Sequence, residues 1–307
     1  MTQILKIKNL VLVLALILMP LSVSQSAGES FDEWTTLRVC ADPNSMPLSN
    51  INEEGFENKI AQLFAKDLGW SLKYKWFPQR LAFFRNTIRS EDPKSQSGYA
   101  CDVAIGASPD PEGAVGTKTY YTSTWVFVIP DTAKFKLVKT SDDLLTLDKT
   151  VLKTLKFGVF QGTPGADWIV KNGLAGQMVP FVRMPSDPKD YPGLIIEKNL
   201  AAGDIDIAIA WGPIAAYSAL RVKKRKVRLI PMIGDREIRT DYSIAMAVRY
   251  SEPEWKKTIE ALIKKHRTMI DQIIKGYGVP IVMSDGSVRI GDSIYTRQKK
   301  INSNAGF

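Results

Sequence analysis

Between residues 37 and 69 the pattern of apolar residues changes from a continuous run to the spacing of a helix with one apolar face. The apolar run LRVCA (37–41) predicts a buried strand, and IAQLFAKDL (60–68) places its apolar residues on one face of a helix. The turn-rich segment between them contains Asp42 and Asn44. Because parallel α/β sheets bind ligands beyond the carboxyl ends of their strands, we expect both side chains near a binding cleft.

Strands and helices continue to alternate after this first unit. SLKYKWF (71–77) predicts a strand, QRLAFFRNTIRS (79–90) a helix and DVAIGA (102–107) a buried strand, and TYYTSTWVFVIP (119–130) predicts a long β segment. Arg80 follows a strand end and is a candidate cleft residue, although a salt bridge within its loop is the competing role. Ser108, directly after a buried strand, is a further candidate.

A second α/β pattern begins near Lys134. It predicts, in order, a strand, glycine turn and helix (155–173), a strand (179–185), a helix (191–203), a strand and turn (204–213), a helix (214–223), a strand (227–233), a returning strand (241–250) and a long helix (252–278). Regular alternation of this kind indicates an α/β fold with mostly parallel sheets. Each half of the chain resembles a small open sheet.

The second half contributes its own candidate contacts. Gly162 and Thr163 precede a predicted helix whose free N–H groups favour an anion or a carbonyl, although the glycine is equally explained by the turn alone. Trp211 ends a predicted strand and is a candidate aromatic wall of the cleft. Trp76, Phe77 and Trp125 are similarly placed, but aromatic residues at strand ends more often belong to the core.

The N-terminus reads as a secretory signal over residues 1–28. Lys6 and Lys8 precede an apolar run of about a dozen residues, which is shorter than the roughly 20 that a spanning helix needs. We therefore expect export to the periplasm, cleavage between Ser24 and Gly28, and no stable membrane anchor; an uncleaved anchor is the alternative.

Composition constrains the partners and the chemistry. The formal net charge is +9, and removing Lys6 and Lys8 leaves 39 basic against 32 acidic residues, a net charge of +7. Much of the excess lies in RVKKRKVR (221–228), which either steers an acidic partner or is simply a solvated loop. An exported chain without an aromatic stacking platform is not expected to bind nucleic acid.

The two cysteines, Cys40 and Cys101, lie close to two of the predicted strands. If these strands are neighbours in an oxidised compartment, a disulfide closes a loop of roughly 60 residues and stabilises the fold by a few kcal/mol. Two buried thiols are the alternative.

Metal and catalytic chemistry have little support in the sequence. His266 is the only histidine, and we expect it on the surface of the long helix, so neither a zinc site nor a histidine-based triad is predicted. A cluster of Asp102, Asp110 and Glu112 has the ligand chemistry of calcium, but loop formation is the simpler interpretation. Glu57 and Glu112 are the candidate acids if the protein is an enzyme, and neither comes with a second perturbing group.

Four motifs in order resemble the type II periplasmic solute-binding protein fold. They are Gly55-Phe56-Glu57, Gly162-Thr163, Gly203 with Asp206, and Tyr277-Gly278. The resemblance implies two lobes joined by two crossover strands, with a cleft between them. Lobe I would then comprise residues 29–132 and 240–307, and lobe II residues 133–239.

The chain lacks the charged pair that amino-acid-binding members of this fold use. Their arginine, which pairs with the ligand carboxylate, is matched here by Gly113, and their acidic residue, which holds the ammonium, by Trp211. Tight binding of a zwitterion is therefore not expected.

Within this fold, the chain is similar in its motifs to the MoxJ/XoxJ group. These are proteins associated with quinoprotein methanol dehydrogenases. The similarity is carried by residues 39–61, WFPQR and RNT (76–87), CDVAIG (101–106), YYTSTWVFV (120–128) and GYGVP (276–280). It implies a non-catalytic periplasmic accessory protein or subunit that contacts the dehydrogenase, and the net charge of +7 favours an acidic surface on that partner. The cofactors, pyrroloquinoline quinone (PQQ) and a metal, would belong to that partner, with none in this chain.

Two further hypotheses remain open. One is a solute-binding protein that delivers a small, non-amino-acid ligand to an ABC transporter, with Thr163 and Arg80 as contacts. The other is an enzyme of the lytic transglycosylase or dehydratase kind. Neighbouring genes would separate the accessory role from transport, and substitution of Glu57 and Glu112 would test the enzyme.

Overall fold

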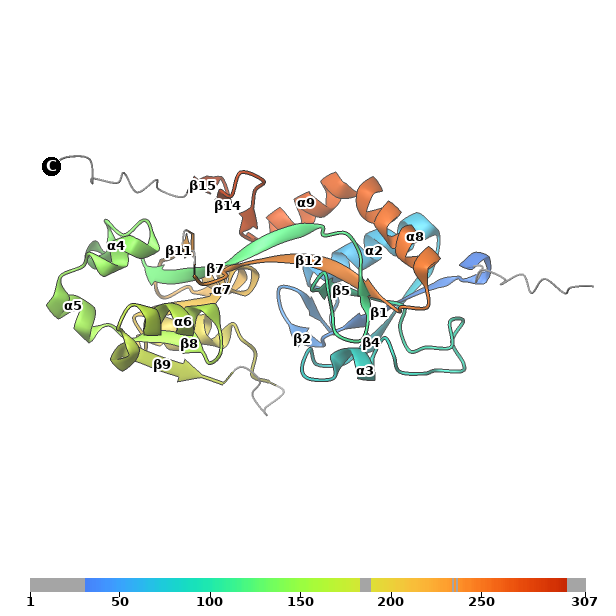
Figure 1. The fold of residues 1–307 in the computed structure, drawn as a ribbon, viewed down its shortest axis with the longest axis horizontal. Coiled ribbons are helices and arrows are strands. Elements are labelled where there is room, and N and C mark those ends of the chain that lie inside the picture. Colours follow the sequence, from blue (N-terminus) through green and yellow to red (C-terminus); the bar gives the residue numbers. More distant parts are fainter. Residues whose placement is uncertain (1–30, 183–188, 234, 236, 297–307) are drawn as a thin grey trace, which may run out of the picture. The chain divides into compact units, whose positions relative to one another are not determined.

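The structure is a computed structural model that describes residues 31–182, 189–233, 235 and 237–296. It is an α/β fold whose two halves each contain a sheet of mostly parallel strands, and Figure 1 shows these halves linked by two long strands, β7 and β12. The predicted signal segment, residues 1–28, lies outside the described residues. Among those that are described, no helix is long and apolar enough to cross a membrane.

The first half contains the strand order β4–β1–β5. Its elements are β1 (Thr36–Ala41), β2 (Asn44–Ser45), β3 (Ser49–Asn50), α2 (Phe56–Leu68), β4 (Ser71–Trp76), α3 (Phe83–Asn86), β5 (Val103–Ala107) and β6 (Val115–Gly116). Strand β1 runs parallel to both β4 and β5, as the sequence predicts. Helix α2 packs on these strands and buries Phe56, Ile60 and Phe64.

The second half contains the strand order β7–β10–β8–β9, with β11 also paired to β7. Its elements are η2 (Ala133–Phe135), α4 (Ser141–Leu145), α5 (Lys149–Thr154), β8 (Phe157–Phe160), α6 (Pro164–Lys171), η3 (Ala175–Gln177), β9 (Met178–Phe181), the π-helix η4 (Ile195–Leu200), β10 (Ile207–Trp211), α7 (Gly212–Arg221) and β11 (Val227–Pro231). Strands β10, β8 and β9 are parallel. Helices α4 and α5, which are only five and six residues long, were not predicted.

Alternate residues of the second sheet enter two separate cores. Phe127 and Ile129 pack with Trp168 of α6 on one face, whereas Val126 and Val128 pack with Ile195 of η4 on the other. This is the two-residue period of a strand that is buried on both faces. Helices therefore cover both faces of this sheet, as expected for the fold class.

Strands β7 (Tyr121–Pro130) and β12 (Asp241–Val248) are shared by the two halves. The first four residues of β7 pair antiparallel with β12, and its remaining residues pair with β10 and β11. The other end of β12 pairs with β5 and β6. The predicted two crossover strands are thus present.

The prediction of a helix over residues 79–90 is wrong for most of this segment. Only α3, four residues long, is helical, and Leu81 is 84% exposed instead of facing the core. Ala82 has a φ of 64°, in the left-handed region, so a continuous helix cannot run through it. Phe83 and Ile88 anchor the segment instead.

The single long helix predicted over residues 252–278 is two helices, α8 (Pro253–Lys265) and α9 (Arg267–Gly276). The break falls at His266, whose φ of −100° and ψ of 16° depart from helical values. Each helix then buries its own apolar face, with Trp255 in α8 and Ile270 in α9. His266 is mostly buried at this junction rather than exposed on a helix surface, with its Nε2 3.3 Å from the Asp67 carboxylate.

The predicted disulfide is present between Cys40 and Cys101, with 5.4 Å between their Cα atoms. Cys40 of β1 lies opposite Ala104 of β5. Cys101 precedes Ala104 by three residues in the sequence and lies just before β5 begins. Both cysteines lie in the core cluster that also contains Phe83 and Ile88. The alternative of two free thiols is therefore wrong.

The last strands of the described residues, β13 (Ile281–Val282), β14 (Val288–Ile290) and β15 (Ser293–Tyr295), form a small sheet. Ile290 packs against the core of the second half, and the Tyr295 hydroxyl donates to the Leu229 carbonyl at 3.3 Å. This segment, which we assigned to lobe I, thus also contacts strands of the second half. The exact lobe boundaries, 29–132 with 240–307 and 133–239, stay a prediction.

Candidate functional site

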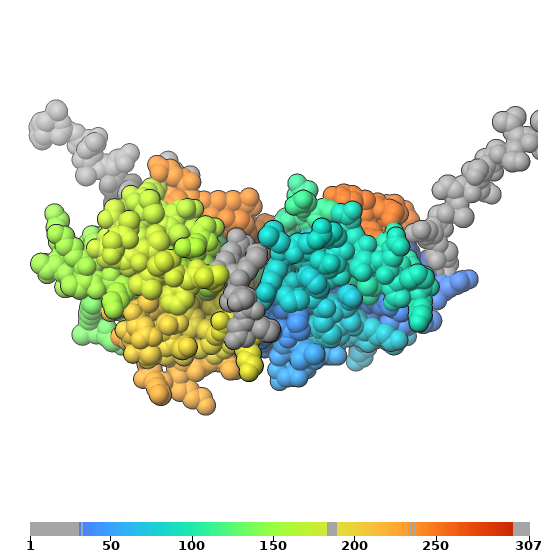
Figure 2. All heavy atoms as spheres, turned by 90° about the horizontal axis from the view of Figure 1, so that it is seen from below, coloured from blue at the N-terminus to red at the C-terminus, as the bar shows by residue number. Residues whose placement is uncertain are grey.

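A pocket of about 730 Å³ lies where the carboxyl ends of β5, β8 and β10 approach the crossover strands. Residues of the first half, blue to teal, and of the second half, green to yellow, form opposite sides of the surface in Figure 2. The pocket is lined by Gly106, Ala107, Ser108, Pro109, Asp110, Trp125, Phe160, Gly162, Thr163, Pro164, Pro192, Ala210, Trp211, Ile214, Arg239, Tyr242, Ser243 and Ile244. Its location matches the ligand position expected for α/β sheets.

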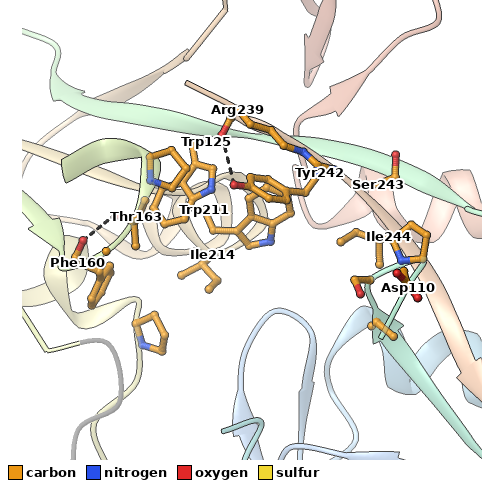
Figure 3. Close-up of a pocket in the computed structure, with 18 residues that line it drawn as sticks. Asp110, Trp125, Phe160, Thr163, Trp211, Ile214, Arg239, Tyr242, Ser243 and Ile244 are labelled. Atoms are coloured by element: carbon orange, nitrogen blue, oxygen red, sulfur yellow. Dashed lines mark hydrogen bonds between the residues drawn. The ribbon is translucent and has the colours of Figure 1, made fainter. Parts of the chain in front are cut away.

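One end of the pocket is aromatic. The rings of Trp125 and Trp211 are 6.3 Å apart, and Trp211 meets Tyr242 edge-on at 5.9 Å (Figure 3). The Arg239 guanidinium lies 4.8 Å from the centre of the Tyr242 ring, which is a cation–π distance. Arg239 and Asp110 are the charged side chains among the lining residues. The sequence did not single out Arg239, because nothing in its neighbourhood marks the loop before β12 as part of a cleft.

The turn into α6 brings two predicted residues to the pocket. Gly162 has a φ of 65°, a conformation that favours glycine, and Thr163 is the N-cap of the helix. The Thr163 hydroxyl donates to the Phe160 carbonyl at 2.6 Å instead of accepting from the first turn of the helix (Figure 3). The positive φ of the turn thus explains why residue 162 is glycine. The first backbone N–H groups of α6 have no side-chain cap and remain available to a hydrogen-bond acceptor.

Trp211 occupies the N-cap of α7, and its side chain joins the aromatic end of the pocket. It lines the pocket at the position where amino-acid-binding relatives of this fold are expected to carry an acid. Gly113, which matches their arginine, is not among the lining residues. Ser108 is among them, at the end of β5. The pocket therefore contains Ser108, Gly162, Thr163 and Trp211, and their contact with a ligand or partner stays a prediction.

The other three predicted contacts, Asp42, Asn44 and Arg80, do not line the pocket. The Asp42 carboxylate accepts hydrogen bonds from the backbone N–H groups of Asn44, at 2.8 Å, and Gln79, at 2.6 Å. The Gln79 side chain in turn donates to the Gly106 carbonyl at 2.9 Å. Asp42 therefore holds two loops of the first half together beside the pocket.

Glu57 is the titratable group that the fold perturbs most clearly near the pocket. Its side chain is buried at the start of α2, and no described residue hydrogen-bonds to its Oε1. Burial, assisted by the negative charge of Asp42, raises the pKa of Glu57 from 4.5 to about 8. The sequence identified Glu57 as a candidate acid but not this environment, because Asp42 is fifteen residues away along the chain.

The three acidic residues considered for calcium do not come together. Asp102 is fully buried and pairs with Arg249 at 2.8 Å, Asp110 lines the pocket, and Glu112 is exposed. Over the described ranges, no group of three or more His, Cys, Asp or Glu side chains is arranged to hold a metal ion.

The basic run 221–228 is largely engaged within the protein. Arg221 pairs with Glu197 at 3.0 Å, Lys226 pairs with Asp131 at 3.2 Å, and Arg228 donates to backbone carbonyls. Lys223 and Lys224 are exposed, and neither makes an ion pair with a residue that the structure describes.

Comparison with known proteins first identifies the class. No family model matches the chain. The structure is similar to the crystal structure of the periplasmic binding protein XoxJ from Methylobacterium extorquens AM1, with a TM-score of 0.64, 28% identity, and coverage of 81% of this chain and 100% of that one. The fold is that of the type II periplasmic solute-binding proteins.

The more specific resemblance is also confirmed. The chain is 27% identical to Protein MoxJ of Methylorubrum extorquens over 276 residues, which cover 85% of this chain and 86% of the relative. It is 24% identical to Protein MoxJ of Paracoccus denitrificans over 272 residues, covering 84% and 93%. Within the type II fold, the chain is thus similar to the MoxJ/XoxJ group that its motifs predict.

Proposed function

We propose that this protein is a periplasmic accessory protein of a PQQ-dependent methanol dehydrogenase that acts by protein–protein contact and not by catalysis. The similarity to the MoxJ/XoxJ group over more than four fifths of the chain supports this role most directly. In this proposal PQQ and the metal belong to the dehydrogenase.

The composition of the pocket agrees with a role other than amino-acid transport. A free amino acid needs a partner for its carboxylate and another for its ammonium. The positions that supply these partners elsewhere in the fold are Gly113 and Trp211, and only Trp211 lines the pocket. The charged pair is therefore absent at these two positions, and the charged side chains of the pocket, Arg239 and Asp110, lie elsewhere in its lining.

The loops beside the pocket offer a surface for a partner protein. Asp42 joins the loop that contains Ile51 to the loop that contains Leu81, through the backbone N–H groups of Asn44 and Gln79. Ile51 is 64% exposed and Leu81 is 84% exposed. We propose Ile51 and Leu81 as contacts of this surface, because the loops that contain them are joined through Asp42.

The experiment is binding of the purified protein to the methanol dehydrogenase of the same organism by surface-based interferometry. We expect Leu81→Asp to weaken binding at least about ten-fold, because an interface anchor contributes on the order of 1–2 kcal/mol. Leu137→Asp is the matched control, since Leu137 is 83% exposed on the second half. Equal effects of the two substitutions would contradict the proposed surface, and failure of the unaltered protein to bind would contradict the function.

A solute-binding role is the second candidate, and the aromatic end of the pocket favours it. Trp125, Trp211 and Tyr242 form a wall suited to a small apolar or planar ligand in a cavity of about 730 Å³. Native mass spectrometry of protein purified from its own periplasm distinguishes the two. A stoichiometric small molecule would support transport, whereas a complex with the dehydrogenase would support the accessory role.

A further inference from the structure

The aromatic end of the pocket contains a cation, the guanidinium of Arg239. Its Nε donates to the Asp241 carbonyl at 3.2 Å, and the guanidinium carbon lies 4.8 Å from the centre of the Tyr242 ring. The side chain is exposed, and no carboxylate of a described residue forms an ion pair with it. Asp110, the other charged lining residue, belongs to the first half, and Figure 3 shows it apart from the aromatic side chains. The guanidinium is therefore available to an anion in the pocket.

The hydroxyl hydrogens at this end of the pocket are already used within the protein. The Tyr242 and Thr163 hydroxyls each donate to a backbone carbonyl, at 3.3 and 2.6 Å respectively. The indole N–H groups of Trp125 and Trp211 make no hydrogen bond to a residue that the structure describes, and both nitrogens are accessible. The side-chain groups left for a ligand here are thus donors, and that of Arg239 is charged. Such a set fits an anionic group that only accepts hydrogen bonds.

Apolar surface surrounds these donors. The Trp125 and Trp211 rings are 6.3 Å apart and tilted by 57°, and Trp211 meets Tyr242 edge-on. Ala210 and Ile214 add aliphatic lining. A flat aromatic ring can pack against such a wall in the edge-on or offset arrangements that aromatic pairs prefer. The cavity of about 730 Å³ has room for a ligand of two fused rings with a polar substituent.

We propose that the aromatic end of the pocket binds a planar aromatic carboxylate. The ring packs against Trp125 and Trp211, and the carboxylate pairs with the Arg239 guanidinium. The contact with the Tyr242 ring and the hydrogen bond from Nε hold the guanidinium in place, which leaves the N–H groups of both terminal nitrogens for the carboxylate. The inference goes beyond the proposed accessory role and does not depend on it, because it concerns the pocket of the free protein.

The residues of the pocket agree with a carboxylate that carries no ammonium group. An aromatic carboxylate needs no acidic partner, and Trp211 stands where amino-acid-binding relatives of this fold are expected to carry an acid. The arginine of those relatives is matched by Gly113, outside the pocket lining, whereas Arg239 enters from the segment just before β12. The cation of this pocket therefore comes from a different part of the fold.

The test compares binding of 2-naphthoate and 2-naphthamide, its uncharged counterpart of the same shape, by isothermal titration calorimetry of the purified protein at about pH 7 and low salt. The unaltered protein should bind naphthoate more tightly. Arg239→Gln should raise the Kd of naphthoate about 3–10-fold, the effect of a charge-assisted hydrogen bond at an exposed residue, and leave that of naphthamide nearly unchanged. Trp211→Leu should weaken both ligands alike, because it removes part of the aromatic wall.

Arg85→Gln is the matched control, since Arg85 is an exposed arginine of α3 that does not line the pocket. Raising the salt to about 500 mM should weaken naphthoate more than naphthamide in the unaltered protein, a comparison that needs no variant. Equal affinities of the unaltered protein for the two ligands, or equal effects of Arg85→Gln and Arg239→Gln on naphthoate, would overturn the proposal. Absence of saturable naphthoate binding to the unaltered protein would overturn it as well.

Discussion

Glu57 is a buried carboxyl group whose ionisation makes the folded protein less stable. A carboxyl group whose pKa is higher in the folded than in the unfolded state destabilises the fold as pH rises between the two values. For Glu57 these values are about 8 and 4.5. Its contribution is therefore absent below about pH 4.5, grows through neutral pH and is complete above pH 8.

The corresponding prediction concerns Glu57→Gln, which is neutral at every pH. At pH 7 this variant should be more stable than the unaltered protein by on the order of 3 kcal/mol, and the difference should vanish near pH 4. Urea unfolding at about pH 4, 7 and 8.5 measures it. A difference that does not change with pH would show that Glu57 ionises normally in the folded protein.

Backbone position alone brings some of the predicted contact residues to the pocket, and their contact with a ligand or partner stays a prediction. Ser108, Gly162, Thr163 and Trp211 lie at or just after strand ends, and all four line the pocket. Asp42 also follows a strand end, but its carboxylate is bound by the N–H groups of its own and a neighbouring loop. Such side-chain pairing, like the burial of Glu57, depends on contacts between segments that a single sequence does not reveal.

At the scale of elements, the disulfide fixes the position of the first strand relative to the segment before β5. Cys40 and Cys101 close a loop of 61 residues in sequence separation. The chain-entropy account gives about 4 kcal/mol for a loop of this length, and measured values are commonly 2–4 kcal/mol.

We therefore expect Cys40→Ala with Cys101→Ala to lower the free energy of unfolding by about 2–4 kcal/mol. Reduction of the unaltered protein by dithiothreitol in urea should produce the same shift, which separates loss of the bond from the loss of side-chain packing. Unfolding midpoints that stay equal with and without reductant would contradict a stabilising role for this disulfide.

Elements with long apolar runs were predicted well, and elements fixed by local backbone geometry were not. Strands β1, β5, β8 and β10 follow from their apolar runs, since most of their residues are buried. The helix at 79–90 failed because Ala82 adopts a left-handed conformation that its sequence does not require. The break at His266 was missed because no proline or glycine marks it.

At the scale of the whole molecule, part of the basic run 221–228 is paired with carboxylates of the protein, which leaves the net charge unchanged but lowers the positive potential close to the run. Arg221, Lys226 and Arg228 are engaged internally, and the basic run leaves Lys223 and Lys224 in the solvent without an ion pair to any described residue. Long-range steering by this surface should therefore depend mainly on these two lysines.

The association rate with the methanol dehydrogenase should fall on the order of ten-fold between about 50 and 500 mM salt, because the exposed charges become screened. Lys223→Glu with Lys224→Glu should lower the rate at low salt and flatten this dependence. Lys59→Glu with Lys66→Glu, an exposed pair on α2, is the control for the same change in net charge. If both double variants respond alike, net charge and not the basic run governs the encounter.

The most direct test of the proposed function is purification of the protein from its native periplasm at low salt, followed by identification of what elutes with it. We predict co-elution with a quinoprotein methanol dehydrogenase at a fixed stoichiometry that survives a second column. Elution as a lone monomer with a small molecule bound would contradict the accessory role, and the identity of that molecule would then define the function.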